Sequence, residues 1–104
     1  MTSIRFTTEV VDEDVQLSLT ELCRVCRAPE EQVRVWVVEG VLEPIGASPQ
    51  EWRFGGTALR RARLALTLTR ELEVNAPGVA LALDLMDEVA ALRAALRRAG
   101  HAQR

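Results

Sequence analysis

Two cysteines three residues apart form the most recognisable chemical motif in this sequence. Cys23 and Cys26 make a C-x-x-C pair, a spacing found in metal sites and in redox-active thiol pairs. A structural zinc site needs four ligands, and the one histidine of the chain, His101, stands near the C-terminus. Because a second pair of ligands is missing, we predict no metal and no cofactor, and we interpret both thiols as small buried hydrophobic groups.

Two carboxylates are the second group that could do chemistry. Asp84 and Asp87 lie one helical turn apart, so they could share a proton or hold a metal. On an amphipathic helix, however, such residues more often form a solvated face, which is the interpretation we favour. The sequence contains neither a nucleophile–histidine constellation nor a glycine-rich phosphate loop. We therefore predict no enzyme activity and no catalytic residue, and we expect the function to reside in surfaces.

The composition is that of one globular domain, which we predict to span residues 1–104. Hydrophobic residues make up 48% of the chain and charged residues 27%, which argues against a disordered chain. The basic residues number 13 and the acidic residues 15, whereas nucleic-acid binders normally carry a basic surplus. A signal peptide and a membrane-spanning apolar run are both missing, so we expect a cytoplasmic protein that does not enter the membrane.

Turn and cap residues divide the chain into four predicted segments. They are a strand with an acidic lead-in (1–17, the strand over 4–10), a helix-turn-helix (18–44), a small β wing (45–56) and two longer helices (57–100). Ser18 and Glu21 form a capping box for the first helix. Pro29 suits the first helical position of the second helix, and Gly40 suits a left-handed residue at its end.

The predicted wing carries two aromatic residues. Glycines and a proline surround Trp52 and Phe54, which favours a short hairpin with both rings on one face. Thr57 and Asn75 are the predicted N-caps of the two longer helices. The predicted fold is therefore mainly α, a winged helix-turn-helix with a small β wing and a C-terminal helix.

Three segments of the chain resemble one protein family. They are Leu19-Thr20-Glu21-Leu22-Cys23, Trp52-x-Phe54 and, as the most specific, Ala76-Pro77-Gly78-Val79-Ala80-Leu81-Ala82-Leu83-Asp84-Leu85-Met86-Asp87-Glu88-Val89. Residues 32–44 are similar, in a more general way, to the second helix and wing entry of MerR-type domains. Together these segments resemble the MerR-like chaperone modulatory protein CbpM family.

The resemblance implies a function in protein binding. Members of that family bind and restrain the DnaJ-type co-chaperone CbpA, so the implied partner is the J-domain of a CbpA/DnaJ-like co-chaperone. J-domains present a basic helix and an exposed His-Pro-Asp loop to the Hsp70 chaperone, and an acidic ligand on that surface would inhibit the hand-off by competition. The alternatives are a MerR-type DNA-binding transcriptional regulator and, more weakly, a homodimeric structural adaptor.

The outer face of the second predicted helix agrees with a protein partner. It carries Glu31, Val35 and Val38, opposite the core side marked by Val33 and Trp36. Carboxylates are repelled by phosphate, and valines offer bases no hydrogen-bond donor. The alternative is that the two outer valines are buried under the wing or the N-terminal strand.

A second candidate contact lies at the start of the last helix. Asp84, Asp87 and Glu88 are available there to a basic partner. Trp52 and Phe54 are either apolar anchors beside such a contact or core residues beneath the wing.

An arginine stripe keeps DNA binding open as the alternative. Arg60, Arg63, Thr67 and Arg70 fall on one arc of the third predicted helix. Such a stripe can follow phosphates, but it is more often a solvated face.

The last helix carries a heptad-like apolar seam. Leu85, Val89, Leu92 and Leu96 follow one another at spacings of four, three and four residues. In MerR-like proteins the C-terminal helix pairs with its twofold mate, so we expect a possible homodimer through this seam. The alternative is that the seam packs onto the preceding helix of the same chain.

Overall fold

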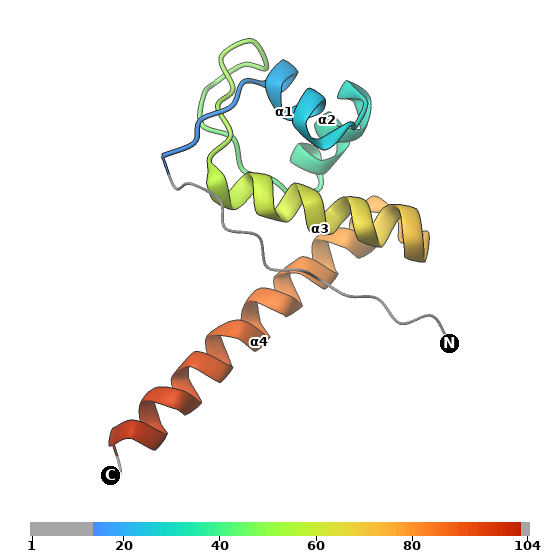
Figure 1. The fold of residues 1–104 in the computed structure, drawn as a ribbon. Helices are drawn as coiled ribbons and strands as arrows, with labels where there is room; N and C mark the ends of the chain where they lie inside the picture. The colour runs from blue at the N-terminus through green and yellow to red at the C-terminus, as the bar shows by residue number, and fades with distance from the viewer. Residues whose placement is uncertain (1–13, 103–104) are drawn as a thin grey trace.

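The chain is mainly helical, as predicted. The computed structural model describes residues 14–102, so the predicted strand over 4–10 lies outside the described residues. Four helices follow one another: α1 (Leu19–Cys26), α2 (Glu30–Val38), α3 (Gly56–Leu72) and α4 (Ala76–Ala102). The first two helices and the loop after them lie above α3, while α4 crosses α3 and extends away from the other helices (Figure 1).

The helix-turn-helix is set by local caps. Ser18 Oγ accepts a hydrogen bond from the Glu21 amide at 3.2 Å, and the Glu21 carboxylate accepts one from the Ser18 amide at 2.9 Å, which confirms the capping box. Gly40 has a φ of 81°, the left-handed geometry predicted for it. Pro29 is the N-cap of α2, one position before the first helical residue predicted for it.

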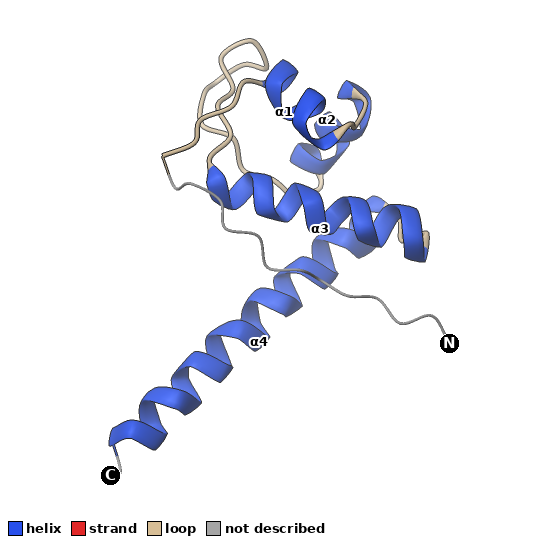
Figure 2. Cartoon of the chain, viewed as in Figure 1, coloured by secondary structure: helices blue, strands red, loops and turns tan. Residues whose placement is uncertain are grey.

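The structure does not support the predicted β wing. Within residues 14–102 the loop between α2 and α3 contains no strand (Figure 2). It makes isolated antiparallel bridges instead, one inside the loop between Ile45 and Arg53 and one between Phe54 and Leu17, which precedes α1. The intervening backbone closes local turns instead, with the Glu51 amide donating to the Ser48 carbonyl at 2.9 Å. Backbone groups committed to such turns are not available to extend a ladder.

The third and fourth helices begin differently from each other. Gly55 is the N-cap of α3 and makes no side-chain cap bond, so the prediction of Thr57 as its cap is wrong. Asn75 fulfils its predicted role, because its Oδ1 accepts a hydrogen bond from the Gly78 amide at 2.9 Å. A Cβ at Gly78 would lie 2.7 Å from Val74 Cγ1 and 3.0 Å from Asn75 Oδ1, so a larger residue here would displace one of these side chains.

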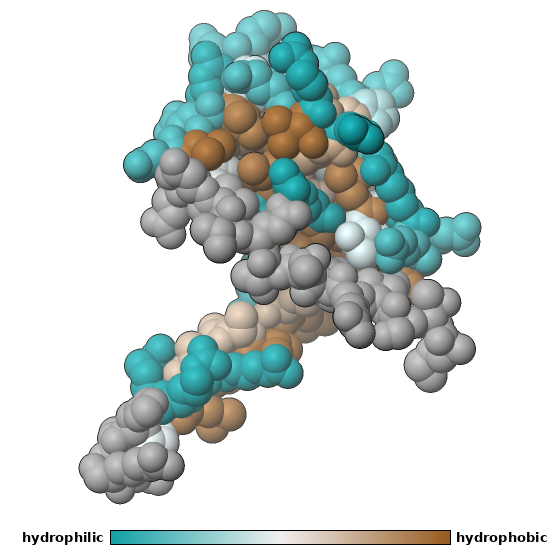
Figure 3. All heavy atoms as spheres, in the orientation of Figure 1, coloured by the Kyte–Doolittle hydropathy of each residue, from teal (hydrophilic) through white to brown (hydrophobic). Residues whose placement is uncertain are grey.

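The core is apolar and sits above the start of α4. Its largest fully buried side chains are Trp36, Phe54, Leu22, Leu42, Leu83, Val33, Val41 and Val79. The last helix supplies Val79 and Leu83, both from its first three turns, and Met86 packs against the core only partly. Hydrophobic atoms are therefore exposed along the protruding part of α4 (Figure 3).

Candidate protein-interaction surface

A hollow of about 910 Å³ opens where the end of α2, the start of α3 and the first half of α4 meet. Its lining residues are Val15, Gln16, Gly40, Val41, Glu43, Ile45, Gly55, Gly56, Thr57, Ala58, Arg60, Arg61, Asp84 and Asp87. Segments far apart in the sequence, from Val15 to Asp87, thus contribute to one surface depression. Its lining combines charged side chains with apolar ones such as Val41 and Ile45.

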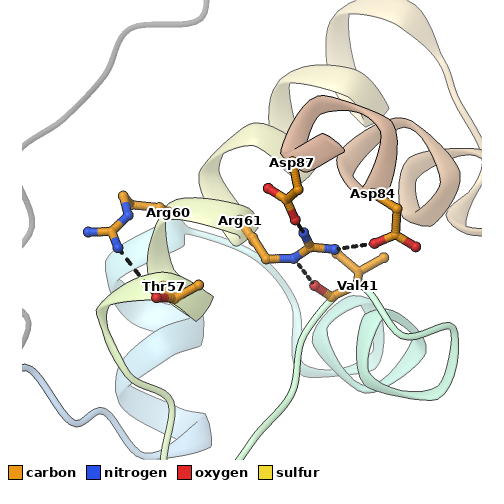
Figure 4. Close-up of polar contacts among 6 residues, drawn as sticks. All are labelled: Val41, Thr57, Arg60, Arg61, Asp84 and Asp87. Carbon is orange, nitrogen blue, oxygen red and sulfur yellow. Dashed lines mark hydrogen bonds and ion pairs between the residues drawn. The ribbon is translucent and has the colours of Figure 1, made fainter. Parts of the chain in front are cut away.

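One arginine ties the three elements around this hollow together. Arg61 Nε donates to the Val41 carbonyl at 2.7 Å, Nη1 donates to Asp87 Oδ2 at 2.5 Å, and Nη2 donates to Asp84 Oδ1 at 3.2 Å (Figure 4). The guanidinium is a planar fork, a shape that suits simultaneous contact with several acceptors. The side chain of Arg61 is only 16% exposed, so these contacts are made in a partly desolvated position.

The two aspartates are therefore occupied by a cation from their own chain. Each still leaves 70% of its side chain exposed, which keeps part of each carboxylate open to a partner. Glu88 is exposed on the next position of α4. The carboxylates bind an arginine, a role that the sequence reasoning did not consider.

The sequence reasoning did not identify Arg61 as a residue of this surface, although the pattern of its neighbours indicates that it has a partner. Ala58, Ala65 and Leu68 are buried on α3, and Arg61 lies three residues after the first and four before the second. It therefore interrupts an apolar helical stripe, and a charge in that position needs a partner.

The outer face of α2 is exposed, as the protein-partner interpretation requires. Val38 is 82% exposed, Val35 is exposed as well, and Glu31 lies on the same surface. Burial of the two valines under the loop after α2 is wrong for the described chain, and the N-terminal strand, the other cover considered, lies outside the described residues. Arg34 on this helix pairs with Glu30 at 3.0 Å, which uses the one basic side chain of the helix.

The two aromatic candidates have different surroundings. Phe54 is fully buried, so the structure contradicts it as a surface anchor and assigns it to the core alternative. Trp52 is half-buried and meets Phe54 edge to face, with ring centroids 6.0 Å apart at 82°. Only Trp52 retains a surface through which it could touch a partner.

The apolar seam of α4 is left exposed by the part of the chain that the structure describes. Leu85, Val89, Leu92 and Leu96 are all exposed, the last of them to 72%. The alternative that they contact α3 is wrong, because α4 leaves the other helices before most of the seam is reached (Figure 1).

The arginine stripe of α3 is partly engaged in internal contacts. Arg70 Nη2 donates to the Arg27 carbonyl at 2.8 Å, and this carbonyl belongs to the left-handed residue that ends α1. Arg60 Nη2 donates to Thr57 Oγ1 at 3.3 Å. Such contacts give at least part of the stripe a structural role.

The cysteine pair shows no sign of reactivity. Cys26 is buried and Cys23 partly so, and no disulfide joins them. Burial, with a smaller contribution from the Glu30 carboxylate, raises the pKa of the Cys23 thiol, which lowers the fraction of nucleophilic thiolate. Within residues 14–102 there is no cluster of three side chains suited to a metal ion. Over the same residues, no helix has the length and apolar character that crossing a membrane demands.

Comparison with known proteins decides the family. The family described as MerR HTH family regulatory protein matches residues 17–99. A chaperone modulatory protein CbpM from Coxiella burnetii (strain Dugway 5J108-111) is 35% identical over 88 residues, covering 85% of this chain and 83% of that protein. The CbpM of Pseudomonas putida (strain W619) is 43% identical over 79 residues, covering 76% and 78%. The chain belongs to the chaperone modulatory protein CbpM family.

Membership of the CbpM family confirms the resemblance drawn from the motifs. The structure explains why the segment 76–89, the most specific of these motifs, has its sequence. Gly78 lies close against the side chains of Val74 and Asn75, Val79 and Leu83 enter the core, and Asp84 and Asp87 hold Arg61. In this CbpM-family chain, the segment therefore docks α4 onto α3 and the shared core.

Proposed function

We propose that the chain modulates a DnaJ-type co-chaperone by binding and inhibiting its J-domain. The name of its relatives, chaperone modulatory protein, supports a chaperone-modulating role. Occupation of the J-domain surface that meets Hsp70 would inhibit by competition, without a chemical step. The same proposal assigns the chain a cytoplasmic location and no enzyme activity.

The observation that carries this proposal is the outer face of α2. A helix-turn-helix that reads DNA places its second helix in the major groove and offers basic or amide side chains to it. Here Glu31 and Glu39 flank the exposed Val35 and Val38. Exposed apolar groups within an acidic rim suit a basic protein surface, whereas DNA phosphates would be repelled.

The acidic residues in the first half of α4 extend this proposed surface. Asp84, Asp87 and Glu88 are exposed, and the hollow connects the first two with Gly40 after α2. A basic J-domain helix could therefore meet carboxylates from both helices. Trp52 is the remaining candidate for an aromatic anchor.

The direct test is titration of a labelled J-domain with this protein, followed by fluorescence anisotropy. We expect saturable binding that weakens as salt rises, together with loss of J-domain-stimulated ATP hydrolysis by Hsp70. The same co-chaperone without its J-domain is the control and should not bind. Binding to that truncated protein with none to the J-domain would contradict the proposal.

A MerR-type DNA-binding regulator remains the second candidate, favoured by the description of the matched family and by the arginines of α3. Titration of labelled duplex DNA at physiological salt separates the two. We expect no measurable binding. Sub-micromolar affinity that falls steeply with salt would favour the regulator instead.

We further propose that the protein is a homodimer through α4. The exposed Leu85, Val89, Leu92 and Leu96 support it, because a second copy would cover one continuous apolar seam. Sedimentation analysis should give a dimer that Leu92→Glu converts to a monomer. Ala91→Glu, off the seam on the same helix, should leave the dimer intact, and a monomeric wild-type chain would contradict the proposal.

A further inference from the structure

The hollow beside Arg61 presents opposite charges in different parts of its wall. Asp84 and Asp87 line it from α4, and Glu43 lines it from the loop after α2. Arg60 lines it from α3 and points away from the aspartates, with Arg61 between them (Figure 4). The depression therefore has an acidic region and a basic region side by side.

Neither region is saturated by its internal contacts. A carboxylate has about four lone-pair sites, and the aspartates each give one oxygen to Arg61 while 70% of each side chain stays exposed. An arginine has about five N–H donors, and Arg60 makes a 3.3 Å bond to Thr57 with one nitrogen. Acceptors and donors thus remain for an occupant of the hollow.

The size of the hollow indicates what kind of occupant it fits. Sites of roughly 300–1,000 Å³ enclose ligands much larger than one side chain. At about 910 Å³, this hollow accommodates a short peptide segment. A nucleic-acid backbone, which carries negative charge only, would be repelled by Glu43, Asp84 and Asp87.

We infer that the hollow receives a segment of the protein partner that carries a basic and an acidic side chain close together. The basic side chain meets Asp84, Asp87 and Glu43, and the acidic one meets Arg60. This inference rests on the proposed function and adds to it the site and the charge pattern of the segment that docks. The part of the lining nearest α2 in the chain begins at Gly40, two residues after that helix ends at Val38.

Two variants test the inference by separate physical effects. Thr57→Trp fills the hollow from an exposed position of α3, and Glu43→Arg reverses the charge of an exposed lining residue. Each should weaken binding of a purified DnaJ-type J-domain by about tenfold or more. Glu43→Arg should also reduce the salt dependence of binding, whereas Thr57→Trp should leave that dependence unchanged. Glu71→Arg makes the same charge change at an exposed residue outside the hollow and is the matched control.

The outcomes separate this inference from the function on which it rests. If the wild-type chain binds the J-domain and both folded variants bind it equally well, the hollow is not the docking site, although the proposed function stands. If Glu71→Arg weakens binding as much as Glu43→Arg, net charge explains the effect and the inference is overturned. If the wild-type chain does not bind the J-domain at all, both fail. Melting temperatures of all variants, measured beside the affinities, identify any loss caused by unfolding, and Arg60→Glu then provides a third lining variant with the same expected loss.

Discussion

Arg61 and Asp87, 26 residues apart in the chain, are joined by a hydrogen bond of 2.5 Å between the Nη1 of one and the Oδ2 of the other. This contact links α3 to α4 at the place where the two helices cross. Since the same guanidinium also holds Asp84 and the Val41 carbonyl, one side chain joins α3 to α4 and to the loop after α2.

Loss of Arg61 should therefore loosen α4. We predict that Arg61→Met lowers the free energy of unfolding by about 1–2 kcal/mol, because the Val41 carbonyl loses its donor and the exposed aspartates lose a partly screened ion pair. Thermal unfolding should show a melting temperature lower by roughly 4–8 °C per kcal/mol. Arg60→Met, next to it on α3, is the control and should cost clearly less. Equal losses in the two variants would contradict a special role for Arg61.

The capping box predicts how stability depends on pH. The backbone and side-chain hydrogen bonds of Ser18 lower the pKa of Glu21 from its usual 4.5, so the folded state favours the carboxylate. This contribution is fully present above about pH 4.5 and is lost as the pH falls through the lowered folded value. Glu21→Gln should flatten the stability profile between pH 5 and pH 3, roughly the range over which carboxylates titrate. If the stability of Glu21→Gln changed with pH in parallel with that of the wild type, the contribution of the Glu21 carboxylate would be contradicted.

Charge reversal at Glu88 should slow association with a J-domain. Glu88→Arg removes a negative charge from the first half of α4, and exposed interface charges act mainly on the rate of encounter. Asp87→Arg is a less direct test, since it also breaks the bond to Arg61. Glu71→Arg supplies a control of equal charge change on α3. Association rates are measured by stopped flow. Identical rates for the wild type and Glu88→Arg would contradict a place for Glu88 in the interface.

Substitutions of Phe54 and Trp52 should distinguish an effect on stability from an effect on partner binding. Phe54→Ala should lower the free energy of unfolding by about 3–5 kcal/mol, because the ring is fully buried. Trp52→Ala should cost less, since the ring is half-buried, although it loses an edge contact worth about 0.5–1.5 kcal/mol. Faster dissociation of the J-domain from folded Trp52→Ala would support Trp52 as an anchor. An unchanged dissociation rate would mean that Trp52 contributes to stability and not to binding.

Replacement of both cysteines should leave partner binding intact. Cys26 is buried, so the double variant Cys23→Ala, Cys26→Ala should be less stable than the wild type by roughly 1 kcal/mol, the cost of a small cavity. Its affinity for a J-domain should not change once folding is matched. Stoichiometric zinc in the purified wild type, lost in this variant together with binding, would contradict the prediction.

Local signals allowed much of the fold to be predicted. Ser18 with Glu21, Gly40 and Asn75 act on their own backbone neighbourhood, and each has the role that its residue type suggests. The 3.6-residue period likewise identifies Trp36 as part of the core side of α2. Such features depend on residues a few positions apart, so sequence reasoning reaches them.

Features that depend on tertiary contacts were not accessible in the same way. The place of Asp84 and Asp87 depends on Arg61, and the buried environment of Phe54 depends on its bridge to Leu17, 37 positions earlier in the chain. The predicted wing failed for a related reason, since backbone hydrogen bonds within the loop compete with strand pairing. Residue type alone does not decide between those two sets of bonds.

The crossing of α4 over α3 divides one continuous helix into two regions of different local stability. Amides near Val79 and Leu83 belong to turns that the core holds, so their hydrogens should exchange with deuterium only through cooperative unfolding. Amides beyond about residue 90 belong to turns without core contacts, and an isolated helix of roughly 12 residues is marginal in water. Exchange in that region should therefore be fast in a dilute monomer and should slow with rising protein concentration if a second copy covers the seam. The exchange rate of each amide in this part of α4 would then measure how much of the protein is dimeric.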